Sequence, residues 1–189
     1  MHNWTEILSS VNHKDVEGVR SATSKKFKLD LIDFFEPKNS KDWRIIEVGS
    51  YCGDTTVILA NLFKQVDAIE ISPVKIKIAE QKTKKYKNVL FHNMDAYKND
   101  WPVTDYEVAF IDCVHTTSAV IQDINNAKKY SSKLKYIIFD DYGAHSQVRT
   151  AIDSVEWKNM IDIGYSDFLP NIGNITGSEG LICEVLYEN

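Results

Sequence analysis

A short loop with two glycines constrains the fold of this chain more than any other feature. Residues 47–56 read Glu-Val-Gly-Ser-Tyr-Cys-Gly-Asp-Thr-Thr and follow the largely apolar run 43–46. Glycine at 49 and 53 lets the backbone turn sharply and leaves room for a ligand beside it. A helix that begins near Thr55 would direct its free N–H groups toward such a ligand. The pattern therefore predicts a buried strand that turns through a binding loop into a helix.

Strand-like and helical segments alternate along most of the chain. Two helical patterns come first, over Trp4–Val11 and Phe27–Phe35. The predicted strands then cover 44–48, 65–71, 89–94, 106–112 and 135–140, and the predicted helices cover 55–63, 73–86, 117–131 and 146–157. This alternation predicts a parallel sheet with helices on both faces.

The C-terminal part departs from that alternation. Residues 159–165 and 180–187 are two strand-like runs with no helical pattern between them. The segment 166–179 contains Pro170, Gly173 and Gly177 and is predicted to be a long loop. We therefore expect an antiparallel hairpin at the end of a parallel sheet.

Composition and charge exclude several functional classes. The net charge of −5 argues against a general nucleic-acid binder, and no apolar stretch approaches the ~18–20 residues of a membrane span. The N-terminus lacks the basic-then-apolar layout of a signal peptide. Cys52, Cys113 and Cys183 form no C-x-x-C pair and are interpreted as free thiols. We expect a cytoplasmic protein with neither a nucleic acid nor a membrane as its partner.

Three predicted strands carry an acidic residue at or near the loop that follows. Glu47 lies beside the glycine loop, Glu70 ends the second strand and Asp95 follows the third. In doubly wound sheets a ligand binds beyond these strand ends, where a carboxylate can accept both hydroxyls of a ribose. Each residue taken singly is equally explained as a polar strand end or a helix cap. The three together indicate a nucleoside site, with Asp95 placed to accept from an adenine amino group.

A second acidic group follows the next two strands. Asp112 ends the strand over 106–112, and Asp140 and Asp141 end the strand over 135–140. Neighbouring strands lie about 4.8 Å apart, so these three carboxylates are expected to converge. Crowded carboxylates repel one another, and a hard divalent ion, Mg²⁺ above all, is a natural partner for oxygen ligands.

The motifs as a whole resemble a known enzyme family. The spacing E-x-G-x-x-x-G-x-T-T resembles motif I of the class I S-adenosylmethionine-dependent methyltransferases. The later motifs are I-D-x-x-H at 111–115, Q-D-I at 122–124, I-I-F-D-D-Y-G at 137–143 and V-R-x-A-I-D at 148–153. Together they resemble the macrocin-type sugar O-methyltransferases, which are related in site design to the catechol O-methyltransferases. The resemblance covers about residues 43–187, and we expect this chain to be without the N-terminal extensions of the larger members.

This resemblance implies a fold and a set of site residues. It implies one domain over 1–189, with N-terminal helices in 1–40 and a Rossmann-like α/β core in 43–187. The doubly wound, mostly parallel sheet would have seven strands in the order 3-2-1-4-5-7-6, with strand 7 antiparallel. The implied S-adenosylmethionine site comprises Glu47, Gly49, Ser50, Tyr51, Gly53, Thr55, Thr56, Glu70, Ile71, Asp95, Ala96 and Asp112. Asp112, Asp140 and Asp141 would hold Mg²⁺, and His115 would be the catalytic base.

The implied reaction is O-methylation of a hydroxyl on a small molecule, and other readings stay open. His145 is a second candidate for the base. We expect His92 to pack in its strand or lie at the cofactor rim, and His2 and His13 to face solvent. The substrate could be a sugar, a catechol-like phenol or another hydroxylated metabolite, and the oligomeric state is undetermined.

Three other functions compete with this interpretation. A nucleic-acid N-methyltransferase would carry an Asp/Asn-Pro-Pro-Tyr/Phe motif where this chain has Asp112-Cys113-Val114-His115. An NAD-dependent oxidoreductase would carry G-x-G-x-x-G, which is missing. A regulatory or interaction module would bind the nucleoside without metal binding or turnover, and the D-x-x-H and Asp-Asp motifs argue against it.

Overall fold

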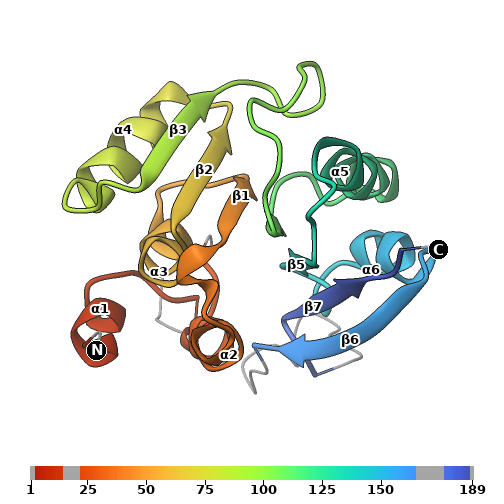
Figure 1. Ribbon diagram of the computed structural model, residues 1–189, viewed down its shortest axis with the longest axis horizontal. Helices are drawn as coiled ribbons and strands as arrows, with labels where there is room; N and C mark the ends of the chain where they lie inside the picture. Colours follow the sequence, from red (N-terminus) through yellow and green to blue (C-terminus); the bar gives the residue numbers. More distant parts are fainter. Residues whose placement is uncertain (1–2, 15–21, 165–176, 188–189) are drawn as a thin grey trace.

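The computed structural model describes residues 3–14, 22–164 and 177–187, and its centre is a seven-stranded sheet (Figure 1). The strands are β1 (Arg44–Val48), β2 (Gln65–Glu70), β3 (Val89–Asn93), β4 (Val108–Ile111), β5 (Tyr136–Phe139), β6 (Trp157–Ile163) and β7 (Gly180–Val185). Their order is β3-β2-β1-β4-β5-β7-β6. β1 to β5 pair in parallel, whereas β7 is antiparallel to both β5 and β6. The predicted fold class and strand order are confirmed.

Helices cover both faces of this sheet. They are α1 (Trp4–Ser9), α2 (Lys25–Phe35), α3 (Asp54–Leu62), α4 (Pro73–Thr83), α5 (Thr117–Tyr130) and α6 (Ser146–Asp153), with short 3₁₀ turns η1 (Glu36–Lys38) and η2 (Ser40–Asp42). Apolar residues of α1, α2 and α3 form one core cluster with the sheet, and those of α5 and α6 form a second. Ile45 of β1 belongs to the first cluster and its neighbour Ile46 to the second, because successive strand side chains point to opposite faces.

Two predicted helices end earlier than their sequence pattern suggests. The helix expected over 146–157 ends at Asp153, and β6 already begins at Trp157, whose indole N–H donates to the Ile152 carbonyl at 2.9 Å. The helix expected over 73–86 ends at Thr83, where the Tyr86 N–H closes a turn onto the Thr83 carbonyl. In both cases a local turn satisfies the last carbonyls and stops the helix. No helix in the described ranges is long and apolar enough to cross a membrane.

The segment after α1 runs toward the carboxyl ends of the strands. The Asn12 N–H donates to Asp54 at 2.8 Å, and the Lys14 N–H donates to the Thr23 carbonyl at 3.2 Å. These bonds fix Lys14 beside the first turn of α3. The expectation for His13 was wrong, since it is buried and its Nε2 lies 2.8 Å from the Leu8 carbonyl oxygen. His2 lies outside the described residues.

Candidate active site

The glycine loop after β1 is held tightly between its neighbours. Gly49 has φ +93°, and a Cβ there would lie 1.9 Å from the Asp112 carbonyl oxygen. The Gly49 and Ser50 N–H groups both donate to the Ile69 carbonyl, at 3.0 and 3.2 Å. Only a residue without a side chain permits so close an approach to the end of β4. The loop therefore joins the carboxyl ends of β2, β1 and β4 into one surface.

A cavity of about 210 Å³ opens beside this loop. Its lining includes Gly49, Ile69, Glu70, Ile71, Met94, Asp95, Ala96, Tyr97, Cys113 and Val114. The Glu70 carboxylate accepts the Tyr51 N–H at 3.0 Å and the Ser72 N–H at 2.8 Å, which fixes its position at the cavity wall. Asp95 accepts the Tyr97 N–H at 2.9 Å, and this bond is the main cause of its lowered pKa. Two oriented carboxylates thus line an otherwise mostly apolar cavity.

A smaller pocket adjoins it on the other side of Gly49. Its lining is Ala22, Glu47, Gly49, Ser50, Tyr51, Cys52, Asp54, Thr55 and Asp112. The structure thus places all the predicted cofactor residues at one of these two hollows except Gly53 and Thr56. Gly53, with φ +80°, is the N-cap of α3, and the Thr56 hydroxyl donates to Glu47 at 2.6 Å. Burial raises the pKa of Glu47 to about 8, so this acid is largely protonated at neutral pH.

A polar pair formed by Tyr97 of the cavity wall and the buried Asp123 behind it escaped the sequence analysis. The Tyr97 hydroxyl donates to Asp123 at 3.0 Å and accepts the Val114 N–H at 3.3 Å. Asp123 of α5 is fully buried, and this burial raises its pKa to about 7. Asp123 belongs to the Q-D-I motif, to which no role was given. It supports the cavity wall through Tyr97.

The three predicted metal-binding carboxylates do converge. β4 and β5 pair with Ile111 opposite Phe139, so Asp112 and Asp140 follow at the same level of the sheet. Oxygen atoms of Asp112, Asp140 and Asp141 lie within 4.8 Å of one another. Asp140 is buried, and burial followed by the charge of Asp112 raises its pKa well above the ordinary value. Asp141 adopts φ +60°, a conformation that turns the chain immediately after Asp140.

His115 lies at the edge of this acidic cluster. Its Nε2 is 3.1 Å from Asp141 Oδ2 and 3.8 Å from Asp112 Oδ1. The contact with Asp141 falls outside hydrogen-bond geometry, so it is attractive only when the His115 ring is protonated. Asp112 is the main cause, and Asp141 a further one, of a raised His115 pKa, although partial burial opposes both. The ring of His145 stacks on that of His115 with centroids 4.5 Å apart, so both candidate bases adjoin the cluster.

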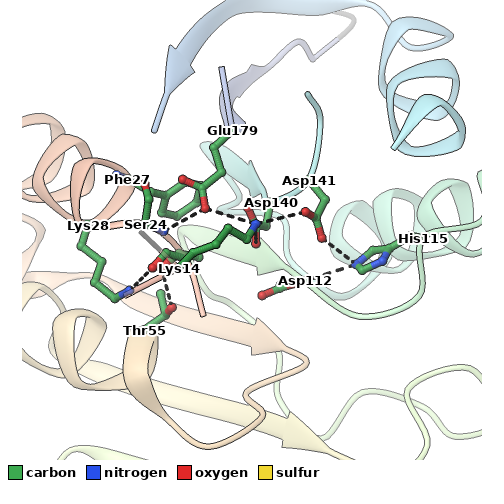
Figure 2. A network of polar contacts seen from close by, with 11 residues as sticks. Lys14, Ser24, Phe27, Lys28, Thr55, Asp112, His115, Asp140, Asp141 and Glu179 are labelled. Atoms are coloured by element: carbon green, nitrogen blue, oxygen red, sulfur yellow. Dashed lines mark hydrogen bonds and ion pairs between the residues drawn. The ribbon is translucent and has the colours of Figure 1, made fainter. Parts of the chain in front are cut away.

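Two further charged residues, Lys14 and Glu179, complete the cluster, and the sequence analysis missed both (Figure 2). The Lys14 ammonium lies 3.3 Å from Asp141, 3.4 Å from Glu179 and 3.8 Å from Asp140. Glu179 precedes β7, is 1% exposed and accepts the Ser24 N–H at 2.9 Å. No local motif marks either residue, because 127 positions separate Lys14 from Asp141.

Comparison with known proteins assigns this chain to a family. Residues 46–142, about half of the chain, match a family model described as "Methyltransferase domain". The chain belongs to this methyltransferase family. No curated protein sequence matches this chain.

Several solved methyltransferases share its fold. The O-methyltransferase TomG from Streptomyces achromogenes, involved in tomaymycin synthesis and solved with S-adenosylmethionine, has a TM-score of 0.68 at 17% identity, covering 97% of this chain and 90% of that one. An S-adenosylmethionine-dependent O-methyltransferase from Thermotoga maritima has a TM-score of 0.66 at 14% identity, over 88% and 67% of the chains. The tRNA (m1A58) methyltransferase TrmI from Aquifex aeolicus has a TM-score of 0.64 at 18% identity, over 97% and 76%. At such identities these likenesses establish the fold and leave the substrate open.

The donor set of this methyltransferase fits a hard divalent cation. Three carboxylates converge, and Oδ1 of Asp140 is buried without a hydrogen-bond partner in the part of the chain that the structure describes. An unsatisfied buried carboxylate oxygen is costly, and an oxygen-seeking cation would relieve that cost. His115, Asp141 and His145 form an overlapping group with mixed nitrogen and oxygen donors.

His92 and Tyr142, which lie near the site in sequence, have structural partners. His92 contacts Asp67 of β2 at 3.1 Å, and it does not line either hollow. The Tyr142 hydroxyl donates to Asp153 at 2.9 Å, while its ring packs against the second core cluster.

Proposed function

We propose that this protein transfers the methyl group of S-adenosylmethionine to a hydroxyl of a small molecule with the help of a divalent ion, Mg²⁺ in the first instance. The observation that carries this proposal is that a cavity and an acidic cluster lie side by side at the carboxyl ends of the strands. A cavity with two oriented carboxylates lies on one side of Gly49, and three convergent carboxylates beside His115 lie on the other. The family assignment and the S-adenosylmethionine in TomG support the choice of cofactor.

The cavity beside the glycine loop would hold the nucleoside. Glu70 uses one lone pair of each oxygen for a backbone N–H, which leaves acceptor capacity for the two ribose hydroxyls. Asp95 and the apolar residues around it would receive the adenine. S-adenosylmethionine, when bound, supplies an electrophilic methyl group at its sulfonium centre. The glycine loop would place the rest of the cofactor over Asp112.

The acidic cluster would prepare the substrate hydroxyl. Asp112, Asp140 and Asp141 would hold the divalent ion, which supplies Lewis-acid polarisation that orients a hydroxyl and lowers its pKa. His115 lies beside two of these residues and would accept the hydroxyl proton at Nε2. A positioned base typically contributes about 10²–10⁴-fold, and orientation of two reactants up to about 7–11 kcal/mol. Positioning is thus the larger effect.

The metal-assisted reaction is tested with a panel of hydroxylated acceptors. Sugars, polyols and catechols would be incubated with radiolabelled S-adenosylmethionine, with Mg²⁺ or with a chelator. We expect transfer that the chelator suppresses, that Asp141→Asn abolishes and that His115→Ala slows without loosening the cofactor. Full activity of His115→Ala at pH 7 would move the base elsewhere, with His145 the next candidate.

The cofactor assignment is tested separately by calorimetry. Glu70→Ala is expected to weaken S-adenosylmethionine binding strongly, because the ribose hydroxyls lose their carboxylate acceptor. Glu80→Ala, which removes an exposed carboxylate of α4, serves as the matched control and is expected to bind normally. Unchanged affinity of Glu70→Ala would reject the ribose assignment. Cofactor binding with neither cation binding nor turnover would instead favour a regulatory or interaction module.

A further inference from the structure

The acidic cluster already contains a cation that belongs to the chain. Lys14 comes from the segment between α1 and α2, and its ammonium contacts carboxylates at the end of β5 and at the start of β7 (Figure 2). Its side chain is 21% exposed, while those of Asp140 and Glu179 are 5% and 1% exposed. Lys14 is therefore half-buried, and it lies against two acids that have little access to water.

The electrostatic balance keeps Lys14 charged. Asp140, Asp141, Glu179 and Asp112 all raise its pKa, and together they outweigh the opposing effect of burial. The three ion pairs of the ammonium hold this positive charge in place within the cluster. One positive charge faces four carboxyl groups, which leaves the cluster negative unless some of the acids are protonated. The cluster can thus attract a divalent cation, which would have to compete with Lys14 for the same carboxylates.

The Lys14 ammonium and a divalent ion would compete for the same carboxylates. An ion that binds Asp141 and Asp140 sits about 2.0–2.6 Å from their oxygens, as Mg²⁺ and Ca²⁺ do. Since Lys14 Nζ is itself 3.3 Å from Asp141 Oδ1, an ion bound to that same oxygen would lie roughly 6 Å or less from the ammonium. Like charges at such a separation repel strongly in a site that is shielded from water. The same carboxylate oxygens also cannot serve both cations fully.

We propose that Lys14 is the resident counter-ion of this pocket, and that its ammonium and a divalent ion exclude each other there. Lys14 then determines how tightly the carboxylates bind a metal ion. Only an ion that binds them tightly enough to displace the Lys14 ammonium can occupy the site. This inference rests on the metal-assisted part of the proposed function and adds a residue that controls it.

The first test removes the charge and measures binding of Mg²⁺ alone. Lys14→Met keeps much of the aliphatic length of the side chain, and Lys158→Met removes a charge from an exposed ion pair with Glu184 as the control. Isothermal titration is done without cofactor or acceptor. We expect Lys14→Met to bind Mg²⁺ at least about tenfold more tightly than the wild type, because a repulsive charge is gone. Lys158→Met is expected to match the wild type.

The second test uses the unaltered protein, so it does not depend on the folding of a variant. Lysine acylation at pH 8.5 is followed at Lys14 by mass spectrometry, with Mg²⁺ or with Na⁺ at equal ionic strength. With Na⁺ we expect slow labelling, because three ion pairs hold the half-buried ammonium against the carboxylates. With Mg²⁺ we expect labelling to accelerate several-fold, because the released side chain leaves the carboxylates and regains contact with solvent.

The outcomes separate this inference from the proposed function. Tighter binding in Lys14→Met together with faster labelling of the wild type supports the exclusion. Equal or weaker binding in Lys14→Met, or Mg²⁺ binding that leaves the labelling rate unchanged, overturns the exclusion and leaves metal assistance standing. Absence of binding in all three proteins overturns both the exclusion and metal assistance, while the cofactor assignment is judged by Glu70→Ala alone.

Discussion

At the scale of single residues, several acids of the site are buried more deeply than charged groups tolerate. Glu47 is 1% exposed, and its carboxyl group is bonded by the Thr56 hydroxyl. Burial disfavours the ionised form, which is why the pKa of Glu47 rises to about 8. A protonated acid under the glycine loop leaves the negative charge of the site with Asp112 and its neighbours.

Glu47 therefore links stability to pH. Between pH 5 and 8 the folded protein keeps the Glu47 proton that the unfolded chain releases, so unfolding becomes easier as the pH rises. Glu47→Gln removes this contribution, and the difference in unfolding free energy between variant and wild type is expected to change by up to about 1.4 kcal/mol per pH unit. Urea unfolding of both proteins at pH 5 and 8 measures it. Asp140 and Glu179 are present in both proteins, so their contributions cancel in the difference between variant and wild type. Unfolding free energies that change with pH in parallel in the two proteins would contradict the prediction.

Gly49 is the residue at which a methyl group has the largest consequence. In Gly49→Ala the new Cβ would overlap the Asp112 carbonyl oxygen, and the backbone would retain an unfavourable φ of +93°. We expect a loss of about 3 kcal/mol or more in unfolding free energy and loss of cofactor binding. Ser50→Ala is the control for stability, since the buried Ser50 Oγ has no hydrogen-bond partner within the described residues. Thermal unfolding with a normal melting temperature for Gly49→Ala would show that the loop can move away from β4.

At the scale of elements, α5 supports the nucleoside cavity from behind. Its N-cap Thr116 accepts the Ala119 N–H, and its buried face carries Asp123 toward Tyr97. The loop after β3 and the loop after β4 meet at the Tyr97 hydroxyl, which also accepts the Val114 N–H. Movement of α5 would therefore change two walls of the cavity together.

Tyr97→Phe tests this coupling. Without the hydroxyl, the buried Asp123 carboxyl group loses its hydrogen bond from Tyr97, and we expect unfolding to become easier by about 1–3 kcal/mol. S-adenosylmethionine affinity is expected to fall several-fold, because the Val114 N–H at the cavity wall also loses its acceptor. Tyr142→Phe removes a bond to the exposed Asp153 and is expected to cost less than about 1 kcal/mol. Equal losses in the two variants would contradict a supporting role for Asp123.

At the scale of the whole molecule, the N-terminal helices are part of the core. Phe27 of α2 is fully buried, and its ring lies 5.9 Å from that of Phe110 in β4. It also packs on Gly180, where a Cβ would lie 2.7 Å from the Phe27 ring, and on Gly164, where a Cβ would lie 2.9 Å from the Phe27 Cβ. One aromatic side chain thus joins α2 to the centre of the sheet and to the antiparallel β6–β7 pair.

Phe27→Ala is expected to destabilise the entire chain in one transition. The lost burial and the cavity left behind cost about 3–5 kcal/mol. If residues 1–189 form one domain, the single thermal transition shifts as a unit. Phe34→Ala, which truncates a half-buried ring of the same helix, is expected to cost clearly less. Two separate transitions, with only the first shifted, would show that the N-terminal helices fold independently of the sheet.

The amino-acid sequence determined the kinds and order of the elements and the acids at the strand ends. Apolar periodicity identifies each strand and helix, and parallel pairing brings the carboxyl ends of strands to one edge. Asp112, Asp140 and Asp141 could therefore be placed together from sequence alone. The ends of α4 and α6 could not, because single turns around Thr83 and Ser154 ended the helices against a favourable pattern.

Only the tertiary structure determined which distant residues complete the site. Lys14 and Glu179 have no motif, and they reach Asp140 and Asp141 because α2 packs on the sheet and β7 inserts beside β5. The burial of His13 and the contact between Gly49 and Asp112 have the same origin. Such contacts depend on how whole elements pack, whereas periodicity and motif spacing report only on neighbours along the chain.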